Sequence, residues 1–386
     1  MPPAKPSLDL LRSLTDEHVL RALTEVRQLT RAELAARTGL SKPTVSDSVR
    51  RLCEAGLLVD TGERTTGRGR VGSYYGLAED VGDALVVGVA PEGIVAERVD
   101  AHGDVTATAT VGIPRPARAA QVVEALTAAV EAVQDGTSRR RPRLAVVSAA
   151  DPVDRASGRL VHLRDSPFLI GELAPSEVLA RFVDGPVSVD NDVNWAARAE
   201  RDAAAGDPDL DDFVHLHLGE GLGCAVVSDG AVRRGHAGLA GEVAHVLVAG
   251  PGERAMPLIE VFDVLRLRRP SSTAIDVPVL LAAVRGDGPG VADVTTALAR
   301  AVCGVLAAAV ALSDPALVVL GGAWGIEPAV LDAVTAEFAR LPRHVPVRAA
   351  RLTDAPSLTG ARTHALHELR TVITTAAPGR DSRSDA

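Results

Sequence analysis

The chain has 386 residues, 46% of them hydrophobic, and a formal net charge of −9. This size and composition are ordinary for a soluble protein of two or three domains and exclude a largely disordered chain. The three cysteines, Cys53, Cys224 and Cys303, are widely separated and form no CxxC pair, which excludes a disulfide framework and favours a reducing compartment.

The sequence predicts a cytoplasmic protein with no membrane partner. Its first residues, MPPAKPSLDLLRSL, lack the apolar block and small-residue cleavage site of a signal peptide. It contains no run of 18 or more apolar residues, which is the length needed to span a bilayer.

The charge is unevenly distributed along the chain. Residues 1–80 contain 12 Lys and Arg against 11 Asp and Glu, a net of +1, whereas the remainder contains 29 against 39, a net of −10. Only the N-terminal segment is therefore suited to face DNA phosphates.

The segment LTRAELAARTGLSKPTVSDSVRRLCEAGLL predicts a helix-turn-helix. Thr30 and Glu33 form a capping box for a short helix that ends at Gly39. Ser41 caps a second helix, with Pro43 in its first turn. A longer amphipathic helix over roughly 15–28 is expected to precede this pair, and the second helix is expected to enter the major groove. The apolar positions that recur at helical spacing in the second helix, and are expected to be buried, are Val45, Val49 and Leu52.

After this pair, TGERTTGRGRVGSYYGL predicts two strands joined by a glycine-punctuated wing that carries Arg64, Arg68 and Arg70. Arginines on such a loop suit phosphate contacts or a narrow minor groove. Asp47, on the exposed face of the second helix, can accept a hydrogen bond from cytosine N4. The alternative is a helical hairpin for dimerisation with a solvated basic loop. The predicted DNA-contacting residues are Ser41, Lys42, Pro43, Thr44, Ser46, Asp47, Arg51, Arg68 and Arg70.

Beyond residue 80 short apolar strands alternate with Ala-rich helices, which predicts an α/β domain over 81–375. About 290 residues are too many for one sheet, so two related lobes with a cleft between them are expected. Residues 1–80 are then the DNA-binding domain, and residues 376–386 a disordered tail. The predicted strands are ALVVGVA, RLAVVSAA, PVSVDND, FVHLHLG, CAVVSDG and ALVVLGG, and the predicted helices are QVVEALTAAVEAV and VTTALARAVCGVLAAAVALS.

Polar residues cluster in VDNDVNWAARAE, where a predicted strand meets a helix. Asp190, Asn191, Asp192 and Asn194 either face a cleft, where a carboxylate can hold or deprotonate a hydroxyl, or only cap the helix. The glycine turns GEGLG at 219–223 and LGGAWG at 320–325 are each weak signals for phosphate binding.

The order of motifs is more specific than any one of them. A winged helix followed by DPVDRASGRLVHL, VDNDVNWAARAE, GEGLGCAVVSDGAVRRGHAGLAGEVAH and VVLGG resembles the ROK family of bacterial sugar kinases and sugar-responsive repressors. The resemblance implies a two-lobed, actin-like sugar-kinase fold. It also implies carbohydrate contacts at Asn191, Asp192, Glu242 and His245, with Asp192 where kinase members place their general base.

The departures from the family pattern predict a protein that is not an enzyme and binds no cofactor. Kinase members carry a D-x-G-G-T phosphate loop, and here the stretch reads VVGVAPEGIVAERVD. Glu220 also brings a negative charge to the GEGLG loop, where it would repel phosphate. Zinc-binding members have C-x-C-G-x-x-G-C, but Pro251, Glu253 and Leu258 stand at these positions, so no metal site is expected.

The sequence therefore predicts a transcriptional regulator, a repressor, that binds a double-stranded DNA operator as a homodimer or homotetramer and responds to a small carbohydrate effector. Two alternatives stay open. One is an active ATP-dependent sugar kinase with an added DNA-binding domain. The other is a regulator whose sugar site has decayed, so that the large domain only oligomerises.

Overall fold

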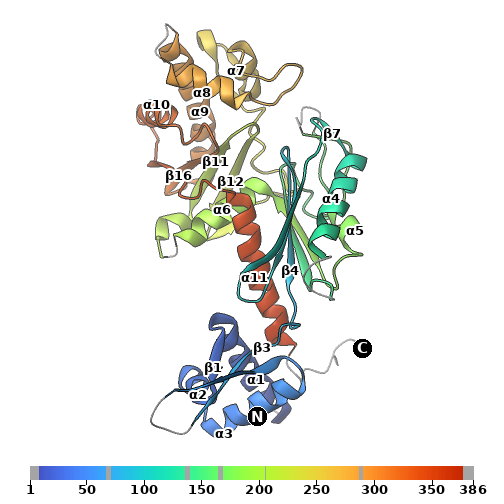
Figure 1. Ribbon diagram of the computed structural model, residues 1–386. Helices are drawn as coiled ribbons and strands as arrows, with labels where there is room; N and C mark the ends of the chain where they lie inside the picture. Colours follow the sequence, from blue (N-terminus) through green and yellow to red (C-terminus); the bar gives the residue numbers. More distant parts are fainter. Residues whose placement is uncertain are drawn as a thin grey trace, which may run out of the picture.

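The computed structural model describes residues 8–66, 71–134, 140–163, 168–204, 206–286 and 290–376. It places a small N-terminal domain beneath two larger lobes (Figure 1). Arg68 and Arg70 of the predicted wing lie outside the described residues, and so does the predicted tail from residue 377 onward.

The N-terminal domain is a winged helix. Its three-stranded sheet has the order β1-β3-β2, with both pairs antiparallel. The first helix, predicted over roughly 15–28, spans Leu8–Glu25 and so begins about seven residues earlier than predicted. It ends before the predicted position because residues 28–30 form a strand that pairs with β3. The elements are α1 (Leu8–Glu25), β1 (Gln28–Thr30), α2 (Arg31–Thr38), α3 (Lys42–Glu54), β2 (Leu58–Arg64) and β3 (Ser73–Leu77).

The predicted helix signals in this domain are confirmed. The Thr30 hydroxyl accepts from the Glu33 amide at 3.2 Å, and the Thr30 amide donates to the Glu33 carboxylate at 2.8 Å. Gly39 ends α2 with φ of 70°. The Ser41 hydroxyl accepts from the Thr44 amide at 3.3 Å. The apolar stripe of α3 is fully buried, comprising Val45, Val49 and Leu52.

The first lobe, residues 84–191, is built on a five-stranded sheet of order β10-β8-β4-β5-β6. Successive residues of a strand point to opposite faces, and in β4 both faces are buried. Leu85 and Val87 pack in one core cluster with α4, and Val86 packs in another with α11. The elements are β4 (Ala84–Ala90), β5 (Gly93–Val99), β6 (Val105–Val111), β7 (Ala117–Arg118), α4 (Ala119–Gln134), β8 (Leu144–Ala149), β9 (Leu169–Ile170), α5 (Pro175–Leu179) and β10 (Val187–Asn191).

The second lobe, residues 192–350, repeats this topology. Its sheet has the order β13-β12-β11-β16-β17, and its parallel and antiparallel pairs occur at the same places. The expectation of two related lobes agrees with this repeat. The elements are α6 (Asp192–Ala203), β11 (Phe213–Leu218), β12 (Leu222–Ser228), β13 (Ala231–Val232), β14 (Leu247–Ala249), β15 (Ala255–Pro257), α7 (Leu258–Val264), α8 (Val277–Arg285), α9 (Val291–Ser313), β16 (Leu317–Gly321), α10 (Pro328–Phe338) and β17 (Val347–Ala349).

Helix α9 is the one helix in the described ranges that is long and apolar enough to cross a membrane by length and composition. Leu298, Val302 and Leu306 of this helix lie in the core of the second lobe, together with Val318 and Leu320 of β16. A core helix passes the same test, so the composition of α9 is weak evidence for a membrane span.

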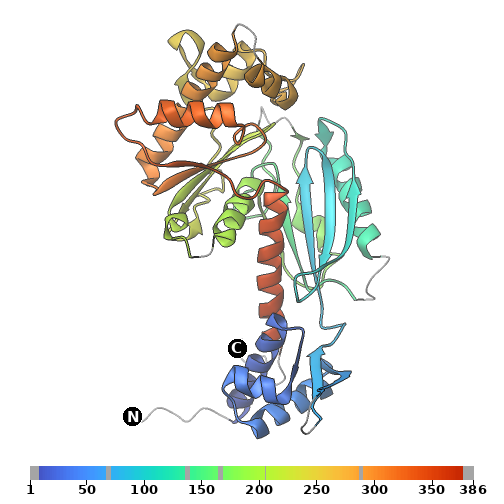
Figure 2. The same cartoon turned by 60° about the vertical axis from the view of Figure 1, so that its left-hand side comes forward.

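The last helix, α11 (Pro356–Thr375), joins all three parts. It lies between the lobes and extends to the winged helix in both views (Figure 1, Figure 2). Gly360 allows it to approach α6 closely, since a Cβ there would lie 2.1 Å from the carbonyl oxygen of Trp195. At its other end, Leu369 and Ile373 share a core with Leu20 and Leu23 of α1.

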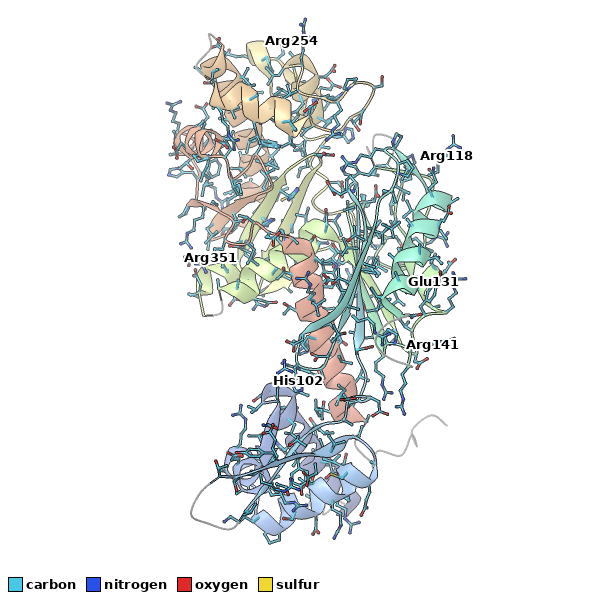
Figure 3. The ribbon with its side chains drawn as sticks, viewed as in Figure 1. His102, Arg118, Glu131, Arg141, Arg254 and Arg351 are labelled. Carbon is cyan, nitrogen blue, oxygen red and sulfur yellow. The ribbon has the colours of Figure 1, made fainter. Side chains whose placement is uncertain are left out.

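Polar contacts reinforce the junction between the winged helix and the first lobe. The Arg370 guanidinium donates to the carbonyl of Thr24 at 2.8 Å and to that of Ala101 at 3.0 Å. Arg27 forms an ion pair with Asp104. His102 lies at the same junction (Figure 3). The winged helix is therefore packed on the first lobe as well as connected to it by the chain.

Candidate functional site

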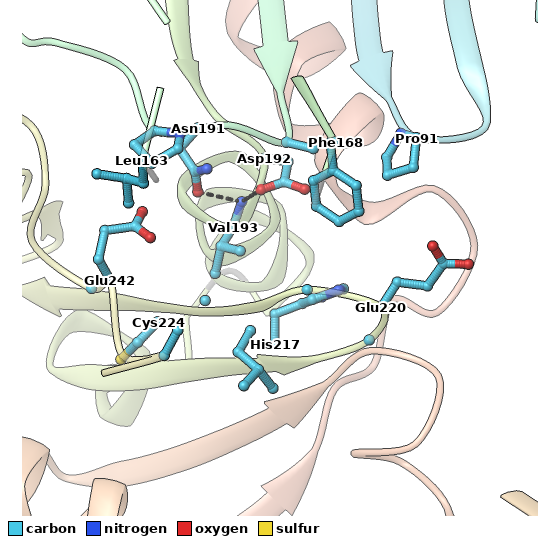
Figure 4. A pocket seen from close by; sticks show the side chains of 18 of the residues that line it. Pro91, Leu163, Phe168, Asn191, Asp192, Val193, His217, Glu220, Cys224 and Glu242 are labelled. Atoms are coloured by element: carbon cyan, nitrogen blue, oxygen red, sulfur yellow. Dashed lines mark hydrogen bonds between the residues drawn. The ribbon is translucent and has the colours of Figure 1, made fainter. Parts of the chain in front are cut away.

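A cleft of about 470 Å³ lies between the two lobes. The turn between β4 and β5 and the start of α6 contribute to its wall, as do residues 219–224 and segment 238–245. Figure 4 shows Glu242 and Asn191 at one side and Glu220 and Pro91 at the other, with Asp192 and Phe168 between them. The four predicted carbohydrate-contacting residues, Asn191, Asp192, Glu242 and His245, all line this cleft.

The junction of β10 and α6 combines helix capping with a polar cleft wall. The Asn191 side-chain oxygen accepts from the Val193 amide at 2.9 Å, and a carboxylate oxygen of Asp192 accepts from the same amide at 2.7 Å. The Asn191 side-chain amide donates to the carbonyls of Ala149 and Asp151. The two interpretations of this cluster are therefore compatible, because the residues that cap α6 also line the cleft.

Asp192 and Glu242 are held in surroundings that favour their protonated forms. The pKa of Asp192 is raised to about 7, first by burial and then by the nearby carboxylates of Asp151 and Glu242, against the lowering effect of the Val193 amide. The pKa of Glu242 is likewise raised to about 7, first by desolvation and then by Asp151, although its side chain remains open to the cleft. Such groups can accept a hydrogen bond from a hydroxyl or take its proton.

Glycine geometry fixes the position of Glu242. Gly241 has φ of 100°, and a Cβ there would lie 1.7 Å from the carbonyl oxygen of Cys224. No other residue fits this contact without moving the backbone. The opening between segment 238–245 and β12 is therefore set by backbone packing.

Two residues of the site were missed by sequence reasoning. Asp151 lies two residues after the end of β8, between the cleft-lining Ala150 and Pro152, and is 3% exposed. His217 of β11 lines the cleft, and burial lowers its pKa to about 4, so its imidazole is neutral. Gly219 leaves space for this ring, because a Cβ there would lie 2.6 Å from His217 Nε2. The sequence signal that could have indicated His217 is the motif HLHLG, in which a polar residue lies in an apolar strand that ends at a glycine turn.

Glu220 lies in the cleft wall, but its charge is paired. Arg115 of the first lobe donates to both of its carboxylate oxygens at 3.1 Å, and Arg269 of the second lobe also pairs with it. The negative charge predicted for the GEGLG loop is therefore present, and it is paired with two arginines. The two arginines and Glu220 form an ion-pair cluster across the lobes.

The position of the kinase phosphate loop is a tight hairpin in this chain. Ala90 pairs with Gly93, so only Pro91 and Glu92 turn between β4 and β5. Both turn residues line the cleft. This turn places a proline ring and a carboxylate where kinase members carry their glycine-rich loop.

Among the residues with described positions, no three His, Cys, Asp or Glu side chains are grouped to hold a metal ion. At the three positions that match the zinc cysteines, Pro251 and Glu253 belong to a short 3-10 turn and Leu258 is fully buried in the core. The structure thus gives His245 no cluster of metal ligands within the described part of the chain.

The predicted DNA-contacting residues occupy the first turns of α3. Ser41, Lys42, Pro43, Thr44 and Asp47 are exposed, and Ser46 is half-buried. These positions leave the N-terminal end of α3 accessible to a DNA groove.

Arg51 is placed differently. Its guanidinium contacts the buried carboxylate of Asp16 in α1, at 2.6 Å and 3.2 Å. Ser48 also donates to this carboxylate. Arg51 therefore joins α3 to α1, and its prediction as a DNA contact is not retained. The neighbouring Arg50, which was not predicted, is exposed and forms an ion pair with Asp47 at 3.0 Å.

Comparison with known proteins agrees with both parts of the molecule. Residues 91–257 match the profile of the ROK family, and residues 12–59 match that of winged helix-turn-helix DNA-binding domains. The DNA-binding transcriptional dual regulator NagC of Escherichia coli is 25% identical over 261 residues, which cover 64% of this chain and 61% of that protein. The matched segments span 28% to 61% of the first curated relatives.

Solved structures give the fold. A ROK family transcriptional regulator described as a homologue of the E. coli Mlc protein aligns with a TM-score of 0.64 and 18% identity, covering 95% of this chain and 99% of that one. A ROK family glucokinase from Streptomyces griseus, solved with glucose and AMPPNP, aligns with a TM-score of 0.54 and 25% identity, covering 73% and 99%. The predicted winged helix followed by a two-lobed sugar-kinase fold is confirmed.

Proposed function

Because the chain combines a ROK-family domain with an N-terminal winged helix-turn-helix DNA-binding domain, we propose that it is a cytoplasmic transcriptional repressor whose cleft binds a carbohydrate without phosphorylating it. The observation that carries this proposal is that a series of packed helices connects the cleft to the winged helix. Helix α6 begins at Asp192 in the cleft and packs on α11, which packs on α1 of the winged helix.

DNA recognition is assigned to α3 and the wing. Two copies of the chain, as a homodimer or within a homotetramer, present their α3 helices to inverted half-sites about one or two helical turns apart. Lys42→Ala or Thr44→Ala should change base preference, because these exposed residues lie in the first turn of α3.

The wing has a separate test. Arg68→Ala combined with Arg70→Ala should weaken binding to all DNA sequences. It should also reduce the slope of log affinity against log salt concentration by about 0.9 for each lost phosphate contact. Equal affinity of this double variant and the parent across a salt series would contradict the wing assignment.

The carbohydrate is proposed to bind through Asn191, Asp192, Glu242 and His245. Carboxylates and amides on rigid turns recognise vicinal hydroxyls well. The absence of phosphorylation is proposed from the β4–β5 turn, where Pro91 and Glu92 occupy the place of a phosphate loop. The free energy of carbohydrate binding can then favour one degree of lobe closure over another. Through α11, that closure can change the distance between the α3 helices of the two copies.

Operator affinity measured by fluorescence anisotropy tests this coupling. A saturating carbohydrate should change the affinity roughly 5- to 150-fold, which corresponds to a coupling free energy of about 1–3 kcal/mol. Asp192→Ala and Glu242→Ala should abolish the response while leaving operator binding without carbohydrate unchanged. A response in these variants equal to that of the parent would contradict the proposed site.

An ATP-dependent sugar kinase is the second candidate function. It is favoured by Asp192, which stands where kinase members place their general base and has its pKa raised to about 7. A phosphate-transfer assay with ATP and a panel of hexoses distinguishes the two functions. We expect no transfer, and transfer that disappears in Asp192→Asn would establish the kinase.

A further inference from the structure

The cleft is larger than one hexose requires. A hexose has twelve non-hydrogen atoms and occupies about 200 Å³ at the packing density of protein interiors. The cleft has a volume of about 470 Å³. A single sugar ring held by Asn191, Asp192 and Glu242 therefore leaves more than half of the cleft unfilled.

The part of the cleft near Glu220 carries apolar side chains beside its polar ones. Phe168 packs over Gly221, where a Cβ would lie 3.2 Å from the phenyl ring. Val277 follows Ile275, whose amide donates to the Glu220 carbonyl at 2.9 Å. Ala323 precedes Trp324, whose indole donates to the Gly219 carbonyl at 2.9 Å. The residues that form this apolar end of the cleft are Phe168, Val277 and Ala323.

The charged groups of the cleft disfavour a phosphorylated ligand. Its lining contains the carboxyl groups of Glu92, Asp192, Glu220 and Glu242 and, among the residues that the structure describes, neither Lys nor Arg. Arg115 and Arg269, at the apolar end, are already paired with Glu220. A phosphate group would have to displace Glu220 from these arginines and would lie among carboxylates.

We infer that the cleft binds an uncharged, two-unit carbohydrate, a disaccharide or a glycoside with an apolar aglycone. One unit contacts Asn191, Asp192 and Glu242, and the second packs on the apolar end. This inference rests on the proposed function of the cleft as an effector site and specifies the class of effector.

Isothermal titration of the full-length protein tests the inference with matched ligands. The panel contains glucose, galactose, mannose and N-acetylglucosamine, the 4-nitrophenyl glycoside and the 6-phosphate of each, and the disaccharides cellobiose, maltose and lactose. We expect a two-unit ligand to bind at least roughly tenfold more tightly than its parent monosaccharide, since it buries additional apolar surface. The 6-phosphate should bind more weakly than the monosaccharide.

Two variants separate the ends of the cleft. Phe168→Ala, at a half-buried position, should reduce two-unit affinity roughly tenfold and leave monosaccharide affinity unchanged. Asp192→Ala should weaken both. Glu220→Gln removes the carboxylate that pairs with Arg269 and leaves Arg115 with Glu92 as a partner at 3.5 Å. It should therefore increase affinity for the 6-phosphate.

The outcomes distinguish this inference from the proposed function. A monosaccharide that binds as tightly as every two-unit ligand, or a 6-phosphate that binds most tightly to the parent, would overturn the inference and leave the effector site intact. If no ligand of the panel binds, the proposed function fails and the inference fails with it.

Discussion

Substitution of Gly360 tests how closely the cleft helix α6 is joined to α11. A Cβ at this position would lie 2.1 Å from the carbonyl oxygen of Trp195 and 2.8 Å from its carbonyl carbon. In Gly360→Ala the two helices must separate by about 1 Å to restore ordinary van der Waals contact. Overpacking of this kind costs about 3 kcal/mol, and the gain in helix propensity offsets about 1 kcal/mol, which leaves a net loss of about 2 kcal/mol.

Gly304→Ala in α9 is the matched control. It is also a helical glycine, but its added Cβ would lie 3.0 Å from Cγ1 and 3.2 Å from Cβ of Val248, so the neighbour has to move much less than in Gly360→Ala. Urea unfolding of the full-length protein, followed by circular dichroism, measures both variants. At a slope of about 3 kcal/mol per M or more, a loss of about 2 kcal/mol lowers the urea midpoint by roughly 0.5 M, and the control should lose less. The reasoning is refuted if Gly360→Ala unfolds at the parent midpoint or if both variants lose the same stability.

Three further outcomes are expected. The unfolding free energy should fall as the pH rises from about 4 to about 7, because Asp192 and Glu242 keep their protons to about pH 7 when folded and release them near their ordinary values of 3.8 and 4.5 when unfolded. Asp192→Asn should reduce this slope of urea midpoint against pH, and an unchanged slope would contradict the assignment. Asp16→Asn should lower the free energy of unfolding by about 2 kcal/mol, since it weakens the contacts to Ser48 and Arg51. Calorimetry should detect this loss as a lower transition temperature, and a temperature equal to that of the parent would show that this carboxylate is dispensable. Elemental analysis should find no stoichiometric zinc, and one zinc per chain would overturn the prediction.

The parts of the fold that could be predicted from the sequence are those determined by nearby residues. The capping box of Thr30 and Glu33, the left-handed Gly39 and the buried stripe of α3 all arise within one or two helical turns. Strand β6 was missed because VTATATV alternates between half-buried and exposed positions and has no continuous apolar run. Helix α11 was missed as a joining element because its partners, α6 and α1, lie far away in sequence.

The same holds for the candidate sites, where contacts between residues far apart in sequence could not be predicted. The resemblance to a family directed attention to Asn191, Asp192, Glu242 and His245, and the structure places them around one cleft. Arg51 was expected on the DNA-facing surface because its helical position is compatible with exposure. Its partner Asp16 lies 35 residues earlier, and no local pattern indicates that contact.

The position of α11 at the end of the chain has a consequence for synthesis. The winged helix is complete at Leu77, but the part of α1 that packs on α11 is covered only when Leu369 and Ile373 have been made. At bacterial elongation rates this interval lasts roughly 15 to 60 s. During that time the α11-facing side of α1 has no partner from the C-terminal helix. A chain that ends before α11 would lack this contact, so the winged helix of such a chain should be less stable than that of the full-length protein.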